Sequence, residues 1–445
     1  MAHSEHPHNL NRRAFVRRAG LVGAAAILPV AGATQAYAAD SAADPEVLFK
    51  AGRFADADRG YARVLRAAPA NARALAQRGY IALLSNRFGY AERFLTGALA
   101  VAPGDVPSAQ RLAECYVRQD APARAIPLLR STGRQRDLAY AELYSHVIGT
   151  PWRIGGAAAA RVPFLGIDPV PSVEASLNGG PPKGFLLDTY ATLDLSAEAA
   201  EEAGVRAVAT ISGIVDGQTV TLYLGILDSF RIGGIEIRNI PVQWNEVRRP
   251  PLPDGSAPAG AFGTTLFYHF LTTMDYAGRA LGLRRKTPTQ QREFTAQAAR
   301  AQLCDRLPLW LAGDHFPCTV GSLLDHGPRV VTVDTGGIAS AFDTTVEIAE
   351  RAGIDVDYAH PVDRPGPRVY PATADRISLG RAIGRNVRGH AAEAPFPGFP
   401  GPGQSGMFGF DLIANFTHEF FKPYAITFDY DNMHLFITGA THPRS

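Results

Sequence analysis

The sequence predicts an α + β protein of several domains, with a helical repeat region ahead of a mainly β region of two lobes. Three observations predict this. Alanines and prolines recur at intervals of 34 residues early in the chain. Short apolar runs separated by glycine, proline, asparagine and aspartate dominate the remainder. Landmarks in this second part occur twice, close to 146 residues apart. A length of 445 residues accommodates two to four domains.

Composition excludes several classes of function. Hydrophobic residues make up 46% and charged residues 19%, enough for a buried core. The 44 basic and 42 acidic residues leave a net charge of +2, too balanced for a nucleic-acid binder that relies on a basic surface. Three cysteines exclude a four-cysteine zinc site, and the zinc-binding and serine-hydrolase motifs are absent. We therefore expect no metal and no cofactor.

Residues 1–38 have the anatomy of an export signal. The paired arginines Arg12 and Arg13 precede Phe15, an apolar stretch follows, and small residues up to Ala38 suit a signal peptidase. This pattern resembles a twin-arginine export signal. The alternative is an ordinary export leader whose arginines are paired by chance. The apolar stretch is short for a membrane span and contains Pro29, so we expect no stable membrane span.

Export places the mature chain in the periplasm or outside the cell. Loss of residues 1–38 removes four arginines and one glutamate, so the net charge falls to −1. An oxidising compartment would allow Cys304 and Cys318 to pair. Cys115 would then be left over, and we expect it to be a buried helix residue.

Residues 44–146 are predicted to be helical, because apolar residues recur at helical spacing. The residues that keep the interval of 34 are Ala57, Ala91 and Ala125, and Pro69 and Pro103. A helix–turn–helix period of 34 residues resembles the tetratricopeptide repeat, in which the alanine allows close helix packing and the proline ends the second helix. The resemblance implies a docking surface for a protein partner. A helical spacer is the alternative.

The second part of the chain is a duplication. Phe185–Ala191 matches Val331–Gly337, each an apolar run that leads into Asp-Thr. Further pairs follow in the same order: Ala203–Val205 with Ala352–Ile354, Phe230–Gly233 with Ile377–Gly380, Arg238–Ile240 with Arg385–Val387, and Gly260–Gly263 with Gly406–Gly409. The closing strands at Met274–Tyr276 and Phe428–Tyr430 lie further apart. We therefore expect an insertion in the second copy just before its last strand.

An apolar strand that ends in Asp-Thr-Gly, followed later by a Gly-apolar-apolar-Gly element, resembles the retropepsin-like aspartic proteases. In particular, the chain is similar to exported bacterial members with two fused lobes. The resemblance implies a first protease lobe at 160–286, a helical or extended connector at 286–306, and a second lobe at 307–438.

The resemblance implies a catalytic pair, Asp188 and Asp334, that holds a water between the lobes. The ionised aspartate takes a proton from the water and the protonated one donates to the scissile carbonyl, so no covalent intermediate forms. Thr189 and Thr335 would exchange hydrogen bonds between the loops. The supporting residues implied are Tyr190 and Gly336 in the catalytic loops; Gly260, Gly263, Gly406 and Gly409 beneath them; and Gly213, Asp216 and Gly217 in a flap over the cleft.

The first lobe departs from the motif, because Tyr190 replaces the glycine that Gly336 supplies in the second. Three placements of the ring stay open. It could point into the cleft and narrow a subsite or bond to the aspartates. It could disturb the loop, or it could pack against a neighbouring strand.

Two functions from different classes follow. The first is an exported aspartic endopeptidase acting on peptides or unfolded proteins. The second is a protease-shaped peptide- or protein-binding module in which Tyr190 has ended catalysis and the helices do the docking. Both aspartates and both threonines are retained, which favours the enzyme. A third arrangement, in which two Asp334 loops meet between chains, is less simple because the two lobes are fused.

Overall fold

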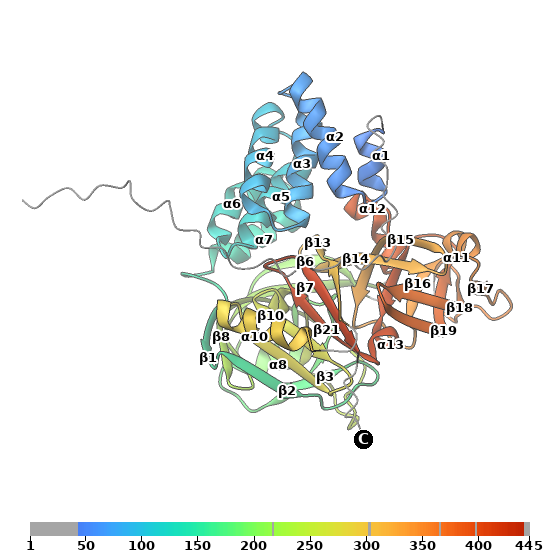
Figure 1. The fold of residues 1–445 in the computed structure, drawn as a ribbon. Coiled ribbons are helices and arrows are strands. Elements are labelled where there is room, and N and C mark those ends of the chain that lie inside the picture. Colours follow the sequence, from blue (N-terminus) through green and yellow to red (C-terminus); the bar gives the residue numbers. More distant parts are fainter. Residues whose placement is uncertain (1–42, 216–217, 301–303, 365, 397, 440–445) are drawn as a thin grey trace, which may run out of the picture. The chain divides into compact units, whose positions relative to one another are not determined.

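The computed structural model describes residues 43–439, apart from 216–217, 301–303, 365 and 397. The predicted export signal lies outside the described residues. Helices occupy residues 45–145, and the chain that follows is mainly β (Figure 1). None of the described helices is both long enough and apolar enough to cross a membrane.

The helices of the first region keep the predicted interval. Their bounds are α1 (Pro45–Lys50), α2 (Phe54–Ala67), α3 (Ala72–Leu84), α4 (Phe88–Val101), α5 (Val106–Val117), α6 (Pro122–Ser131) and α7 (Gln135–Ser145). The helices α2, α4 and α6 therefore begin 34 residues apart. Asn71 caps α3 by accepting a hydrogen bond from the N–H of Ala74. Pro69 and Pro103 follow the ends of α2 and α4, as predicted.

The small residues of the repeat are packed between helices. Ala57, Ala91 and Ala125 are each 0% exposed, because neighbouring helices approach closely at these points. At Gly79 in α3, a Cβ would lie 2.6 Å from Leu95 Cγ in α4, so a larger residue does not fit. The alanine spacing thus correctly predicted the positions where these helices touch.

Two sheets of eight strands form the two lobes. The first contains β1 (Arg153–Gly156), β3 (Ser172–Leu177), β4 (Lys183–Leu187), β5 (Leu193–Ser196), β6 (Ala207–Val215), β7 (Gln218–Ile232), β8 (Ile235–Asn245) and β9 (Gly260–Phe262). The second contains β13 (Trp310–Ala312), β14 (Phe316–Leu323), β15 (His326–Asp334), β16 (Phe342–Thr345), β17 (Asp355–Val356), β18 (Val369–Leu379), β19 (Ala382–Ala392) and β20 (Ala414–Thr417).

A third sheet of six strands joins the lobes. Its strands are β2 (Ala159–Pro163), β10 (Phe270–Asp275), β11 (Ala280–Arg285), β12 (Cys304–Pro308), β21 (Tyr424–Asp429) and β22 (His434–Gly439). The closing strands of the two lobes, β10 and β21, pair at its centre, where the hydroxyls of Thr273 and Thr427 are 2.8 Å apart. The shorter helices of this region are α8 (Ala197–Glu202), α9 (Thr264–Phe267), α10 (Pro288–Ala298), α11 (Val346–Ala352), η1 (Gly401–Gln404), α12 (Ser405–Phe408) and α13 (His418–Phe421).

The two lobes repeat one topology, which confirms the duplication. The first sheet runs β8-β5-β9-β4-β3-β7, and the second runs β19-β16-β20-β15-β14-β18. Each contains the same two parallel pairs, β4 with β9 and β5 with β8 in the first, and β15 with β20 and β16 with β19 in the second. Even local geometry repeats, since Asn239 and Asn386 both have a positive φ, at 61° and 49°.

The topology corrects one part of the predicted alignment. In the first lobe Gly260–Phe262 pairs in parallel with Phe185–Leu187, and in the second lobe Ala414–Thr417 pairs in parallel with Val331–Asp334. The counterpart of Gly260–Gly263 is therefore Ala414–Thr417, and the prediction of Gly406–Gly409 was wrong. The insertion precedes β20, between β19 and β20, and contains η1 and α12.

The inserted segment binds the helices to the second lobe. Phe408 and Phe410 pack with Phe49 and Phe54, and the N–H of Asp411 donates to the carbonyl of Lys50 at 2.7 Å. The rings of Phe54 and Phe410 meet edge to face, 5.0 Å between centroids. Insertion and helices therefore share one apolar core.

Two edge strands lie under helices. In the first lobe, Ile211 of β6 and Leu224 of β7 pack against Ala139 and Leu143 of α7. In the second, the guanidinium of Arg118 in α5 donates to the backbone carbonyls of Leu311 and Gly313, at the edge strand β13. Arg118 is 9% exposed and is also paired with Glu114 at 2.7 Å.

The cysteines bear on the predicted disulfide. Cys318 is a free, buried thiol in β14, so it does not form the disulfide with Cys304 that the sequence left open. Cys115 is buried in α5, as predicted.

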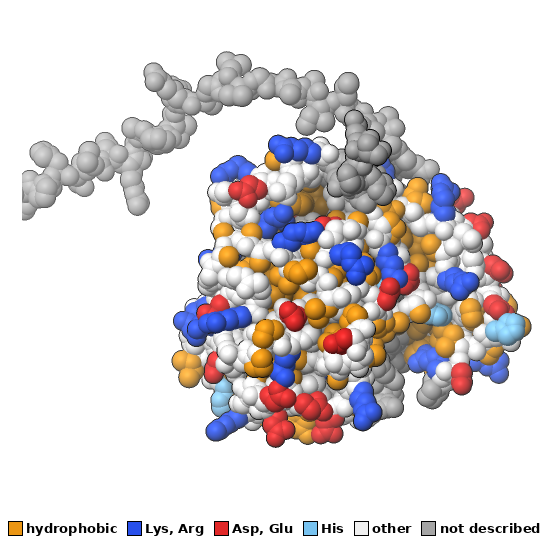
Figure 2. All heavy atoms as spheres, turned by 90° about the horizontal axis from the view of Figure 1, so that it is seen from below, with side chains coloured by type: hydrophobic (Ala, Val, Ile, Leu, Met, Phe, Trp, Pro, Cys, Tyr) orange, Lys and Arg blue, Asp and Glu red, His pale blue; other side chains and the backbone are white. Residues whose placement is uncertain are grey.

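On the face shown in Figure 2, basic and acidic side chains are interspersed with apolar ones, so this face carries no extended field of one sign.

Candidate active site

The two predicted aspartates occupy equivalent places in the two lobes. Asp188 directly follows β4, and Asp334 is the last residue of β15. The Oδ1 of Asp188 accepts the N–H of Tyr190 at 2.7 Å, and the Oδ1 of Asp334 accepts the N–H of Gly336 at 2.9 Å. The same loop conformation thus forms in both lobes, even though Tyr190 replaces a glycine in the first.

Thr189 and Thr335 lock these loops together. The N–H of Thr189 donates to Oγ1 of Thr335 at 3.0 Å, and the N–H of Thr335 donates to Oγ1 of Thr189, also at 3.0 Å. The Oγ1 of Thr189 then donates to the carbonyl of Val333 at 2.7 Å. Both threonines are 0% exposed, so these bonds do not compete with water. The loops of one chain therefore meet each other without a second chain.

Asp188 and Gly336 lie in direct contact across the junction. A Cβ added at Gly336 would lie 2.2 Å from Asp188 Cγ and 2.5 Å from both of its carboxylate oxygens. The second lobe therefore needs glycine at this position because the carboxylate of the first lobe occupies the space.

Tyr190 extends from the first lobe into the second. Its ring meets Phe316 edge to face, 4.9 Å between centroids, and its hydroxyl lies 3.0 Å from Gln404 Oε1 and 3.1 Å from Asn415 Oδ1. Of the three placements left open by the sequence, the ring takes one that keeps the loop intact and packs against a neighbouring strand, β14. The hydroxyl bonds to residues around Asp334, not to the carboxylate itself.

Asn415 connects the second aspartate to its surroundings. Its Nδ2 donates to Asp334 Oδ2 at 2.9 Å and lies 3.2 Å from Asp343 Oδ2. Its Oδ1 accepts from Thr332 Oγ1 at 2.8 Å. Asn415 is 0% exposed. Sequence reasoning missed Asn415 and Asp343; alignment on the closing Asp-Tyr strands would have placed Asn415 opposite Ala261.

Burial gives the carboxyls of Asp188 and Asp334 higher pKa values than those of exposed aspartates. Burial, joined by the charge of Asp188, raises the pKa of Asp334 well above its usual range, against the opposing hydrogen bond from Asn415. Burial also raises the pKa of Asp188, to about 6, and the N–H of Tyr190 limits that rise. Near neutral pH the pair therefore holds one proton, so that one carboxyl is ionised and the other is protonated.

The glycines of the first lobe lie against backbone carbonyls of the first lobe. A Cβ at Gly263 would lie 1.7 Å from the carbonyl oxygen of Asp188, and one at Gly260 would lie 2.2 Å from that of Asp194. Gly406 has no heavy atom within 4 Å of such a Cβ, and Gly409 has only a ring atom of Phe49, at 3.8 Å. These two glycines therefore do not support the second loop, because they belong to the insertion.

The predicted flap is the hairpin of β6 and β7. Gly213 pairs with Val220 across it, and a Cβ at Gly213 would lie 2.7 Å from Cδ1 of Leu222. Asp216 and Gly217 lie outside the described residues.

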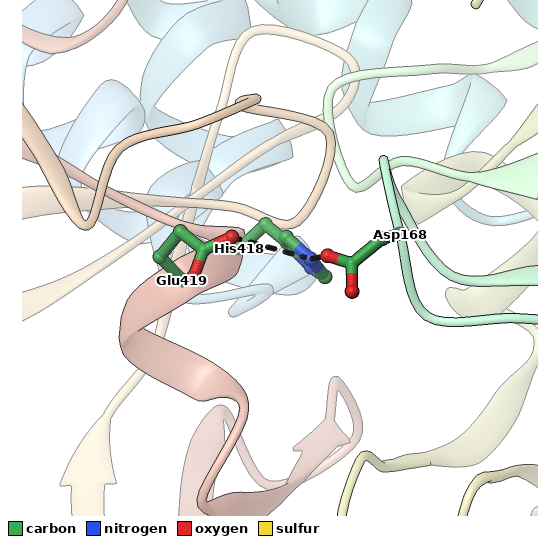
Figure 3. A group of neighbouring side chains, drawn as sticks. All are labelled: Asp168, His418 and Glu419. Atoms are coloured by element: carbon green, nitrogen blue, oxygen red, sulfur yellow. Dashed lines mark hydrogen bonds and ion pairs between the residues drawn. The ribbon is translucent and has the colours of Figure 1, made fainter.

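One group elsewhere has the composition of a metal site. Asp168 lies beside His418 and Glu419 of α13 (Figure 3). The Nε2 of His418 is 3.3 Å from Asp168 Oδ1, and His418 is 0% exposed. Lys422 Nζ lies 2.6 Å from Asp168 Oδ1 and 2.6 Å from Glu419 Oε1. Since its ammonium already pairs with both carboxylates, the group is an ion-pair cluster that ties the first lobe to α13.

Comparison with known proteins supports a protease-like fold. A family model described as aspartyl protease matches residues 173–266, a stretch of the first lobe that contains Asp188 and Gly263. No curated protein matches the chain.

Among solved structures, the chain is similar to a mutant O-GlcNAc transferase from Thermobaculum terrenum, at 23% identity and a TM-score of 0.22. The match covers 24% of this chain and 21% of that one.

Proposed function

We propose that the chain is an aspartic endopeptidase that hydrolyses peptide bonds with a water activated between Asp188 and Asp334. The observation that carries the proposal is the reciprocal pair of hydrogen bonds between Thr189 and Thr335, which brings the two Asp-Thr loops together within one chain. The aspartyl protease match to the first lobe supports the same reading.

We assign the role of general base to Asp188 and that of general acid to Asp334, because burial raises the pKa of Asp334 further. Asp188, ionised above about pH 6, takes a proton from the water as the water oxygen attacks the carbonyl carbon. Asp334, still protonated, donates its proton to the carbonyl oxygen and becomes ionised. When the tetrahedral intermediate collapses, a hydroxyl proton returns to Asp334 and Asp188 donates its proton to the leaving amine. Both carboxyls are thus restored.

Tyr190 is compatible with this chemistry. Its N–H still binds Asp188, and its ring is accommodated by Phe316. A distorted first loop would favour a binding module in which Tyr190 has ended catalysis, whereas both carboxylates accept an N–H from the residue two positions on. The enzyme is therefore the better supported of the two functions.

The proposal extends to location and to the helices. The resemblance of residues 1–38 to a twin-arginine export signal supports a location in the periplasm or outside the cell. The helices α2 to α7 are tetratricopeptide-like units, as supported by their starts 34 residues apart and by the buried alanines between them. They are available to dock a protein.

The test is cleavage of a random peptide library by residues 39–445, with Asp188→Asn and Asp334→Asn as inactive variants. Asp228→Asn, at an exposed carboxylate, is the matched control. We expect cleavage by the parent and the control, and at least a 1,000-fold loss in both active-site variants, the order expected when a member of a concerted catalytic group is removed. Full activity of either active-site variant would refute the mechanism.

A further inference from the structure

A large cavity separates the helices from the second lobe. It has a volume of about 730 Å³. Its helical wall comes from α3, α5 and α7, and its opposite wall comes from residues 313–316 and the inserted segment at 406–409. The cavity is thus built jointly by the two regions of the chain.

The charge of this cavity is unbalanced. Its lining contains five arginines, Arg73, Arg111, Arg118, Arg134 and Arg136, and three carboxylates, Glu114, Asp137 and Asp314. Each carboxylate already has a partner. Glu114 binds Arg118, Asp137 accepts from Gln110 at 2.8 Å, and Asp314 binds His315. Arg73 pairs with Glu46, and Arg136 lies 3.8 Å from Asp314. Arg111 and Arg134 have no ion pair among the described residues, so the cavity keeps an excess of positive charge.

Arg111 is the more buried of these two arginines. It is half-buried in α5, and its guanidinium carbon lies 3.7 Å from the centre of the Tyr80 ring. Among the described residues it has no ion pair and no hydrogen bond. Burial lowers the pKa of this guanidinium. A desolvated cation with five unused donors is costly unless an anion binds it.

Gln77 adds a second unused polar atom. It lines the same cavity from α3, is 2% exposed, and its Oε1 has no donor within the described residues. The ligand that suits both groups carries a carboxylate for Arg111 and an N–H for Gln77. An acidic residue of a peptide offers both.

The far wall of the cavity leads to the aspartates. Phe316 lines the cavity and meets the ring of Tyr190, two residues after Asp188. His315 lines it as well, and its charge opposes the burial that raises the pKa of Asp188. A peptide bound in the cavity is therefore next to the first catalytic loop.

We propose that this cavity, through Arg111, binds a carboxylate of the substrate, so that the enzyme selects peptides with an acidic residue or a free C-terminus near the bond that is cut. The inference rests on the proposed function for cleavage, but binding can be measured without it. The same chemistry is supplied by a side chain or by a chain terminus, which the experiment separates.

Binding is measured by fluorescence anisotropy with the full chain carrying Asp334→Asn. The probes are four pools of fluorescein-labelled dodecapeptides, rich in Glu or with Gln in its place, each with a C-terminal acid or amide. We expect the preferred pool to bind at least tenfold tighter than its neutral match and to lose this preference in Arg111→Gln. Arg111→Lys should keep most of it, because the charge remains.

Arg130→Gln, at an exposed arginine of α6 outside the cavity, is the matched control and should bind as the parent does. Equal binding of all pools, an effect of Arg130→Gln as large as that of Arg111→Gln, or no binding at all overturns the inference. A Glu preference identifies a side chain, and an acid-over-amide preference identifies a terminus. Selective binding without any cleavage by the parent would refute the proposed function and leave the binding site standing.

Discussion

The hydroxyl of Tyr190, in the first catalytic loop, lies 3.1 Å from Oδ1 of Asn415, the residue whose amide holds the aspartate of the second lobe. The residue that breaks the motif in one lobe therefore supports the carboxylate of the other. A glycine at 190 would leave that support, and the space beside Phe316, empty.

Restoring the motif with Tyr190→Gly should therefore harm the protein. We expect a loss of about 2 to 3 kcal/mol in the free energy of unfolding, less than for a fully buried aromatic ring because Tyr190 is half-buried, together with lower activity. Tyr190→Phe keeps the ring and should cost about 1 kcal/mol, the value of one hydrogen bond. Urea unfolding of both variants beside the parent gives the comparison, and a Tyr190→Gly variant that is more active and equally stable would contradict it.

The pH dependence of kcat/KM should have its acid limb near pH 6. Asp188 must be ionised to act as the base, and its pKa is about 6, so activity rises as the pH passes that value. Activity falls again only where Asp334 ionises, well above the usual range for aspartate. Asn415→Ala removes a donor that favours the ionised form, so its alkaline limb should move upward by about one unit. An optimum below pH 4 would show that these assignments are wrong.

The free energy of unfolding should fall as the pH rises from 4 to 6. A carboxyl whose folded pKa is raised to about 6 stabilises the fold fully below its unfolded pKa, near 3.9, and loses that contribution as the pH rises to 6. Relative to Asp188→Asn, the parent should therefore lose about 2 to 3 kcal/mol between pH 4 and pH 6. Denaturant unfolding at four pH values measures this, and parallel curves for the two proteins would exclude the shift.

Two glycines should respond oppositely to one methyl group. Gly263→Ala places a Cβ 1.7 Å from the carbonyl oxygen of Asp188, so we expect a loss of about 3 kcal/mol or more and of activity. Gly406→Ala meets nothing within 4 Å and lies in α12, where alanine is a better helix former, so it should be neutral or slightly stabilising. Thermal unfolding of both decides whether Gly406 has the supporting role that the sequence alignment gave it.

The parts of the site that could be predicted are those formed by residues adjacent in the sequence. The Asp-Thr loops and the contact between Thr189 and Thr335 follow from a duplicated motif. Gly406–Gly409 was wrongly aligned with Gly260–Gly263 because the two segments have similar sequences and lie 146 residues apart. Strand pairing shows that Ala414–Thr417 is the true counterpart of Gly260–Gly263. Only the register of the sheet distinguishes them, and register depends on partners distant in sequence.

The remainder depended on contacts that no local pattern records. Asn415 reads as an ordinary strand residue until β20 is placed beside β15. The helices gave no sign that Arg118 reaches the second lobe or that Arg111 faces a cavity, since a helical repeat specifies its own packing and not its neighbour.

The contacts of α5 and α7 have a consequence for handling the β lobes alone. Each lobe has an edge strand that pairs with a neighbouring strand on one side only, β6 in the first lobe and β13 in the second. The helices cover the first through Leu143 and bind the carbonyls of the second through Arg118. A fragment cut down to the lobes would expose two edge strands together with the apolar side chains around Ile211 and Phe410. By covering these edge strands, the helices prevent the lobes of different molecules from pairing strand to strand and aggregating.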